Sequence, residues 1–95
     1  MPAYWISHVT ISNPTAYKAY RQANAVAFTK YGARFLVRGG AQEVVEGVVR
    51  PRTVVIEFPD LKAAQDGYHS SEYQTAKAKW DGVSLADLCI VERYL

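Results

Sequence analysis

The chain has 95 residues, of which 49% are hydrophobic, and its eleven basic and nine acidic side chains leave a net charge of +2. This length supports one domain with a single core, and the hydrophobic share is typical of an ordered globular protein. The charge is too small and too diffuse for a nucleic-acid-binding surface. No apolar run approaches the roughly 20 residues of a membrane span. We therefore expect one domain over residues 1–95 that binds neither nucleic acid nor membranes.

The N-terminal residues contain no basic segment followed by an apolar run, so they do not indicate a signal peptide. A single cysteine, Cys89, excludes an internal disulfide. This cysteine and the two histidines lie far apart in the sequence and form no metal-binding motif. Phosphate-binding loops, Rossmann fingerprints and nucleophile elbows are also missing from the sequence. We expect a cytoplasmic protein that uses no metal and no cofactor.

Residues 4–11 are rich in β-branched and aromatic side chains and predict a first strand. Asn13 and Pro14 then form a typical helix start, in which a capping side chain precedes a proline in the first turn. Apolar side chains recur with helical spacing and predict a helix over residues 14–31. Gly32 stands where a glycine commonly ends a helix.

Residues 33–37 predict a second strand, which Gly39 and Gly40 interrupt by a bulge or a bend. The chain is expected to continue in an extended conformation over residues 42–49. A third strand follows over residues 52–58, again rich in β-branched side chains.

A short helix is predicted over residues 59–68, because its first residues are Pro and Asp. Another helix begins at Ser70 or Ser71 and reaches Trp80. Ser71 and Gln74 have the spacing of a capping box.

Residues 87–94 predict the last strand, so the order of elements is β-α-β-β-α-β. This order is typical of the ferredoxin-like α+β fold, an antiparallel four-stranded sheet with two helices on one face. Two helices cover only one face, yet three strands are apolar on both faces, at residues 35–37, 54–56 and 88–91. An uncovered apolar face is typical of an interface, and a second copy related by a two-fold axis is its simplest cover. We therefore expect a homodimer.

A resemblance to a known family extends over nearly the whole chain. The sequence resembles the small bacterial family called domain of unknown function 1330, and the similar residues are Tyr4-Trp5-Ile6, Asn13-Pro14, Tyr17, Tyr31-Gly32-Ala33-Arg34-Phe35-Leu36-Val37-Arg38-Gly39-Gly40, Glu46-Gly47, Val54-Val55-Ile56-Glu57-Phe58-Pro59 and Ser71-Glu72-Tyr73-Gln74. The resemblance implies a dimeric α+β barrel and no particular activity. The wider superfamily includes cofactor-free monooxygenases, haem-binding enzymes and lactone isomerases. Family members often have arginine where this chain has Trp80, so the resemblance does not support an anion bound at that position.

Three polar side chains are candidates for a catalytic site. Side chains alternate between the faces of a strand, and this alternation predicts that His8, Arg38 and Glu57 share the face opposite the helices. An acid, a base and an imidazole in a partly dry cleft are typical of a functional site. His8 or Glu57 would accept a proton, and Arg38 would stabilise developing negative charge. The same placement also fits an interface ion pair between Arg38 and Glu57, with His8 as its hydrogen-bonded neighbour.

The candidate ligand-binding residues are Arg38, Asn24, Tyr68 and Trp80. Asn24 lies on the apolar face of the first helix, where a buried amide needs partners. It either ties the helix to a loop or points a donor at a ligand. Tyr68 and Trp80, together with Tyr73, could line the mouth of a pocket for a flat apolar compound, although aromatic side chains at helical spacing also form cores.

Two functions follow from these observations. The first is a homodimer that binds a small organic molecule between sheet and helices, with cofactor-independent catalysis as its extension. The second is a non-catalytic accessory or ligand-sensing dimer. RNA binding ranks last, because the central strand over residues 53–58 is acidic and aliphatic instead of basic and aromatic. The sequence does not decide whether the protein is an enzyme.

Overall fold

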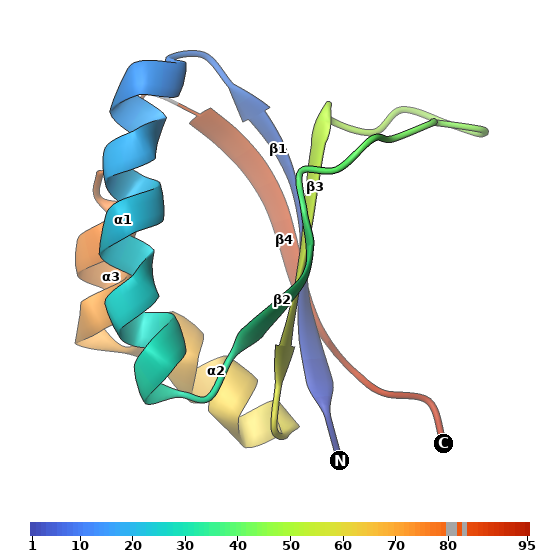
Figure 1. The fold of residues 1–95 in the computed structure, drawn as a ribbon. Coiled ribbons are helices and arrows are strands. Elements are labelled where there is room, and N and C mark those ends of the chain that lie inside the picture. Colours follow the sequence, from blue (N-terminus) through green and yellow to red (C-terminus); the bar gives the residue numbers. More distant parts are fainter. Residues whose placement is uncertain (80–81, 83) are drawn as a thin grey trace.

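The structure is a computed structural model of residues 1–95 that describes all of them except 80, 81 and 83. Its described elements follow in the order β1 (Ala3–Ile11), α1 (Pro14–Lys30), β2 (Arg34–Arg38), β3 (Arg52–Phe58), α2 (Leu61–His69), α3 (Ser71–Lys77) and β4 (Ser84–Glu92) (Figure 1). No helix in the described part of the chain is long and apolar enough to cross a membrane.

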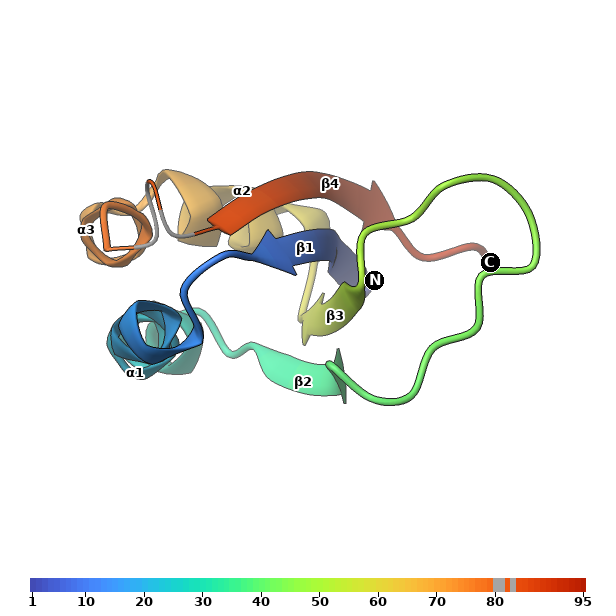
Figure 2. The ribbon, with the colours of Figure 1, turned by 90° about the horizontal axis from the view of Figure 1, so that it is seen from above.

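The strands form one sheet in the order β2-β3-β1-β4, and every neighbouring pair is antiparallel. All the helices lie on one face of this sheet (Figures 1 and 2). The predicted ferredoxin-like α+β fold is therefore confirmed. The second helical region consists of two short helices, α2 and α3, as its two predicted segments indicate, so that three helices in the described part of the chain cover the sheet, one more than the β-α-β-β-α-β order counts.

Local signals position α1. The Asn13 side chain caps its start and accepts a hydrogen bond from the Ala16 backbone N–H at 3.1 Å. At its end the Ala33 N–H donates to the Phe28 carbonyl at 2.9 Å, which is the wide bond of a Schellman motif. Gly32 has a φ of +70° in this motif, a conformation that favours glycine. The predicted start and end of the helix are both confirmed.

Ser70 separates α2 from α3. Its hydroxyl donates to the Gly67 carbonyl at 2.7 Å and accepts from the Tyr73 N–H at 3.1 Å, so it serves the end of one helix and the start of the next. Ser70 is therefore the cap, and the predicted capping box of Ser71 with Gln74 is wrong. Gln74 instead donates to the carbonyl of Tyr68. The predicted helix end at Trp80 lies outside the described residues.

Two sequence expectations about extended segments are corrected. Residues 39–51, here called the arm, have no regular secondary structure and project from the sheet on the side without helices (Figures 1 and 2). Residues 42–49, which are expected to be extended, form no strand and pair with none of the strands in the described part of the chain. The last strand runs over Ser84–Glu92 and not over residues 87–94. Its first inward side chains, Ser84 and Ala86, are too small to give a hydrophobic signal.

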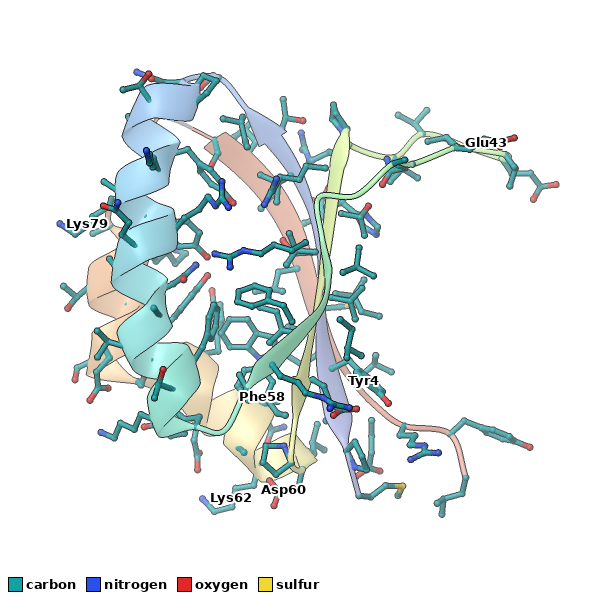
Figure 3. The ribbon with its side chains drawn as sticks, viewed as in Figure 1. Tyr4, Glu43, Phe58, Asp60, Lys62 and Lys79 are labelled. Carbon is teal, nitrogen blue, oxygen red and sulfur yellow. The ribbon has the colours of Figure 1, made fainter. Side chains whose placement is uncertain are left out.

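Trp5 is the centre of the core between sheet and helices. It is 2% exposed, and its indole N–H donates to the Ala64 carbonyl at 2.9 Å. Its ring contacts four other aromatic rings, those of Phe28, Phe58, Tyr68 and Tyr73. Alternation along β1 and β3 then assigns the remaining side chains to the two faces. Figure 3 shows the result, with Phe58 on the helix side and Tyr4 on the other.

Candidate functional site

A β-bulge in β2 decides which face of the sheet Arg38 occupies. The register between β2 and β3 shifts between Phe35 and Val37, so that Leu36 is an extra residue. Arg38 consequently points to the same side as Phe35, towards the helices, and its guanidinium lies 4.1 Å from the centroid of the Phe35 ring. The prediction that Arg38 shares a face with Glu57 is wrong, because simple alternation does not hold across a bulge.

His8 and Glu57 lie on the face without helices, here called the outer face. The carboxylate of Glu57 accepts a hydrogen bond from Arg34 Nε at 2.9 Å, and Nδ1 of His8 lies 3.0 Å from Thr53 Oγ1. The sheet therefore separates both residues from Arg38. Neither the expected three-residue site nor the alternative Arg38–Glu57 ion pair is formed.

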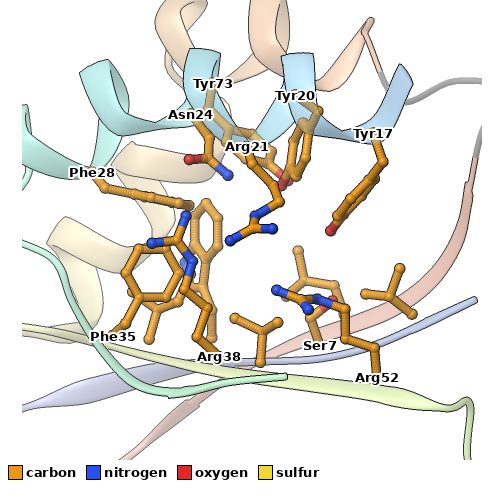
Figure 4. A pocket seen from close by; sticks show the side chains of 15 residues that line it. Ser7, Tyr17, Tyr20, Arg21, Asn24, Phe28, Phe35, Arg38, Arg52 and Tyr73 are labelled. Carbon is orange, nitrogen blue, oxygen red and sulfur yellow. The ribbon is translucent and has the colours of Figure 1, made fainter. Parts of the chain in front are cut away.

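Arg38 instead belongs to a cleft between α1 and the helix-facing side of the sheet (Figure 4). Two other arginines reach the same cleft: Arg21 from α1 and Arg52 from β3. Among the described residues, none of the three forms an ion pair with a carboxylate. Between these guanidiniums and the core lie the aromatic side chains Phe28 and Phe35. One end of the cleft is thus positively charged and its floor is apolar.

The cleft continues towards β4 and α3 as a second, larger lobe. The two lobes share lining residues, among them Tyr17, Tyr20 and Tyr73, so they adjoin one another. The second lobe has a volume of about 350 Å³, and Tyr68, Ser84 and Ala86 also line it. The hydroxyls of Tyr20 and Tyr73 lie 3.0 Å apart and form a hydrogen bond. The lobe between the arginines is smaller, about 40 Å³.

Three buried polar atoms at this cleft have no hydrogen-bond partner among the described residues: Asn24 Oδ1, Arg52 Nε and Ser84 Oγ. Asn24 is only 5% exposed, and its amide is aimed into the cleft from α1 (Figure 4). Buried polar atoms are normally paired, and an unpaired one costs about 1–3 kcal/mol. Unpaired polar atoms from α1, β3 and β4 that belong to two adjoining lobes are typical of a small-molecule site, where a few polar groups converge.

Burial and mutual repulsion set the electrostatics of the cleft. Partial burial, with Arg21 and Arg52 nearby, holds the pKa of Arg38 below its usual value. Burial raises the pKa of Tyr17, although the positive charges of Arg52, Arg21 and Arg38 oppose this effect. Burial, reinforced by Tyr73, raises the pKa of Tyr20 far above its usual range. Both tyrosines therefore stay protonated at neutral pH and offer hydroxyl groups, not bases.

The structure brings together part of the predicted ligand-binding set. Arg38 and Asn24 line the lobe with the arginines, and Tyr68 lines the second lobe. Trp80 lies outside the described residues. Sequence reasoning missed Arg21 and Arg52, although both carry a signal. Arg21 follows Tyr17 by one helical turn, and Arg52 has the same strand parity as the buried Val54.

Gly39 leaves room for the guanidinium of Arg52, and a substitution at Gly39 tests this. Gly39 has a φ of +71°, and a Cβ there would lie 2.2 Å from Arg52 Nη1. Gly39→Ala is expected to displace this guanidinium and to lower the free energy of unfolding by about 1 kcal/mol. Gly40→Ala is the matched control, since no heavy atom lies within 4 Å of a Cβ there. Thermal unfolding of both variants measures the difference, and equal melting temperatures would contradict the prediction.

Comparison with known proteins gives the family. The model of the family described as domain of unknown function DUF1330 matches residues 2–94. The chain belongs to the DUF1330 family. The resemblance found in the sequence is thereby confirmed. No curated protein has a significantly similar sequence.

Solved structures share the fold at low sequence identity. The RPA0582 protein of unknown function from Rhodopseudomonas palustris has a TM-score of 0.74 at 16% identity, covering 99% of this chain and 83% of that one. SnoaB from Streptomyces nogalater, a cofactor-independent oxygenase, has a TM-score of 0.67 at 10% identity, with 99% and 94% covered. A dimeric protein of unknown function and ferredoxin-like fold from Bacteroides fragilis has a TM-score of 0.63 at 10% identity, with 97% and 96% covered. At these identities the likeness shows a common fold.

The described residues of the DUF1330 chain contain no cluster of three His, Cys, Asp or Glu side chains that could hold a metal ion. The polar groups that line the cleft are three guanidiniums, tyrosine hydroxyls, the Asn24 amide, the hydroxyls of Ser7 and Ser84 and the ammonium of Lys77, together with aromatic rings.

Proposed function

We propose that this protein binds a small organic molecule in the cleft between the helices and the sheet. The observation that carries the proposal is the set of buried atoms without a partner among the described residues, Asn24 Oδ1, Arg52 Nε and Ser84 Oγ, at two adjoining aromatic-lined lobes. Small-molecule sites are mostly apolar spaces with a few convergent polar groups, typically of about 300–1,000 Å³. The larger lobe, at about 350 Å³, falls within that range.

A cofactor-independent oxygenase is the second candidate function. It is favoured by the shared fold with SnoaB, a protein described by that activity. The tyrosines of the cleft favour ligand binding over catalysis. Burial raises the pKa of Tyr17 and Tyr20, so both hydroxyls stay protonated and neither can serve as a base. Conversion of a bound compound, detected by mass spectrometry, would favour the enzyme. Binding without conversion would favour an accessory or ligand-sensing role.

We also propose that the outer face of the sheet is covered by a second copy of the chain. Leu36, Val37 and Val91 are 47%, 41% and 44% exposed there, and the less exposed Ile6 and Val55 lie between them. Apolar patches of this kind mark interfaces, and a two-fold axis lets one patch cover its own copy. The Bacteroides fragilis protein of the same fold is dimeric, which supports this choice of partner.

The arm supports the same proposal. It lies on the outer side of the sheet, with Glu43 near its tip (Figure 3). Val45 and Val48 in the arm are 81% and 101% exposed, values that a folded chain rarely gives to neighbouring valines. A partner on the outer face would contact these side chains. In such a dimer His8 and the Arg34–Glu57 ion pair would be interface groups.

Ligand binding is tested with two planar probes, 2-naphthoate and its neutral analogue naphthalene-2-carboxamide. At least one is expected to shift backbone NMR signals of cleft residues such as Trp5 and Tyr73. Ala86→Phe, which fills the larger lobe, should remove the shifts. Ala25→Phe adds the same ring on the exposed side of α1 and should leave them. The proposal fails if neither probe shifts these signals, or if Ala86→Phe leaves binding intact.

A further inference from the structure

We infer that the ligand of this cleft is an organic anion whose charged group is held by Arg21, Arg38 and Arg52. The inference rests on the proposed ligand-binding function and adds the chemical class of the ligand. It starts from the convergence of three guanidiniums that arise from three different elements, α1, β2 and β3, at one end of one cleft (Figure 4).

This convergence needs specific local structure. The bulge at Leu36 turns Arg38 inward, and the positive φ of Gly39 leaves space for the guanidinium of Arg52. The Arg38 guanidinium lies over the Phe35 ring at 4.1 Å, and this contact fixes its position. An arginine side chain that simply extends into solvent would need neither the bulge, nor the glycine, nor the ring contact.

The three arginines at this end of the cleft have no carboxylate partner among the described residues, whereas Arg34 and Arg50 each pair with one. Arg52 Nε is buried without a hydrogen-bond partner. Like charges that are held close together destabilise the protein, and the pKa of Arg38 is lowered by burial first and by the charges of Arg21 and Arg52 in addition. A bound anion would relieve the repulsion and satisfy the free donors.

The shape of the cleft defines the rest of the ligand. The lobe between the arginines, about 40 Å³, has room for one small charged group such as a carboxylate. The adjoining lobe, about 350 Å³, is lined by the rings of Tyr20, Tyr68 and Tyr73 as well as by Ser84 and Lys77, and it has room for an aromatic body. Guanidinium binds carboxylate through paired N–H donors in one plane, which adds geometric selectivity. The fitting class is thus a monocarboxylate with a planar apolar body, and not a free inorganic anion.

The test measures the affinity of the wild-type protein for 2-naphthoate, naphthalene-2-carboxamide and inorganic phosphate by isothermal titration calorimetry. We expect 2-naphthoate to bind about tenfold or more tightly than the carboxamide, because hydrogen bonds to charged groups exceed neutral ones by that margin. The naphthoate affinity should fall with added salt, while the carboxamide affinity should stay constant. Phosphate should bind more weakly than naphthoate, since it leaves the larger lobe empty.

Three variants, each of which lacks one positive charge, show which arginines bind the charged group of the ligand. Arg38→Gln and Arg21→Gln should each lower the naphthoate affinity about tenfold and leave the carboxamide affinity unchanged. Arg34→Gln is the matched control, because it removes the same charge from the same strand as Arg38 but on the outer face. Arg21 is exposed on α1, so its variant tests the inference even if Arg38→Gln fails to fold.

The outcomes separate this inference from the proposed function. Equal affinities for naphthoate and the carboxamide would overturn the anion inference and leave the proposed function standing. Binding of neither probe would overturn both. Phosphate binding as tight as naphthoate would also overturn the inference, because the cleft would then be a site for an inorganic ion.

Discussion

Val55→Asp is expected to convert the protein from a dimer to a monomer. Val55 lies in β3 on the outer face, paired with Ile6 of β1 and Val37 of β2, so it is at the centre of the apolar patch that the proposed partner covers. In the dimer the new carboxylate would be buried opposite its symmetry copy, and burial of unpaired charge costs several kcal/mol. In the monomer it would remain solvated, since the outer face is then open.

The measurement is size-exclusion chromatography with light scattering at micromolar concentration. Val26→Asp is the matched control, because Val26 is 63% exposed on α1, in the helix layer and away from the outer face. The control should remain dimeric, and Val55→Asp should retain its far-UV circular dichroism while its mass halves. A wild-type protein that elutes as a monomer would refute the dimer proposal itself.

The sequence predicted the features that depend on local chemistry. Asn13 and Gly32 identified both ends of α1, because capping and a positive φ are properties of a few neighbouring residues. Parity likewise placed Trp5 and His8 on opposite faces of β1 correctly, since no bulge interrupts the pairing of that strand. The order of elements then left few ways to arrange the sheet.

The same reasoning failed where the pairing between distant segments determines which face of the sheet a side chain occupies. Phe35, Leu36 and Val37 are all apolar, so alternation in β2 gives no information about faces, and only the pairing with β3 reveals the bulge. One extra residue moved Arg38 from the outer face to the cleft. The break at Ser70 was ambiguous for a related reason, because Ser71 is an equally good cap until the bond to the Gly67 carbonyl selects Ser70.

The candidate site was also beyond prediction as a whole. The helical spacing from Tyr17 and the strand parity with Val54 place Arg21 and Arg52 on the inner faces of their elements, but neither signal alone points to a binding site. Their significance comes from their convergence with Arg38, which needs the tertiary structure. Asn24 was the exception, because an amide on the apolar face of a helix is unusual by itself and pointed to either a structural tie or a ligand contact.

Asn24→Leu distinguishes these two roles of the amide and is expected to separate stability from binding. In the free protein Asn24 Oδ1 is buried without a partner, so an apolar side chain of similar size removes a cost. The free energy of unfolding should remain unchanged or rise by about 1 kcal/mol. The affinity for 2-naphthoate should fall about tenfold, because the amide lines the cleft beside the arginines and its loss removes a hydrogen bond to a charged group.

A carboxylate only accepts hydrogen bonds, so the amide would contact the ligand through its NH2 group, turned towards the cleft, with Oδ1 on the side of the Tyr20 hydroxyl. Gln22→Leu, an exposed position two residues away on α1, is the control and should change neither quantity. Chemical denaturation and calorimetry on the same samples measure both effects. If Asn24→Leu lowers the free energy of unfolding by 1 kcal/mol or more while naphthoate still binds, the amide is a structural tie and the cleft binds its ligand without it.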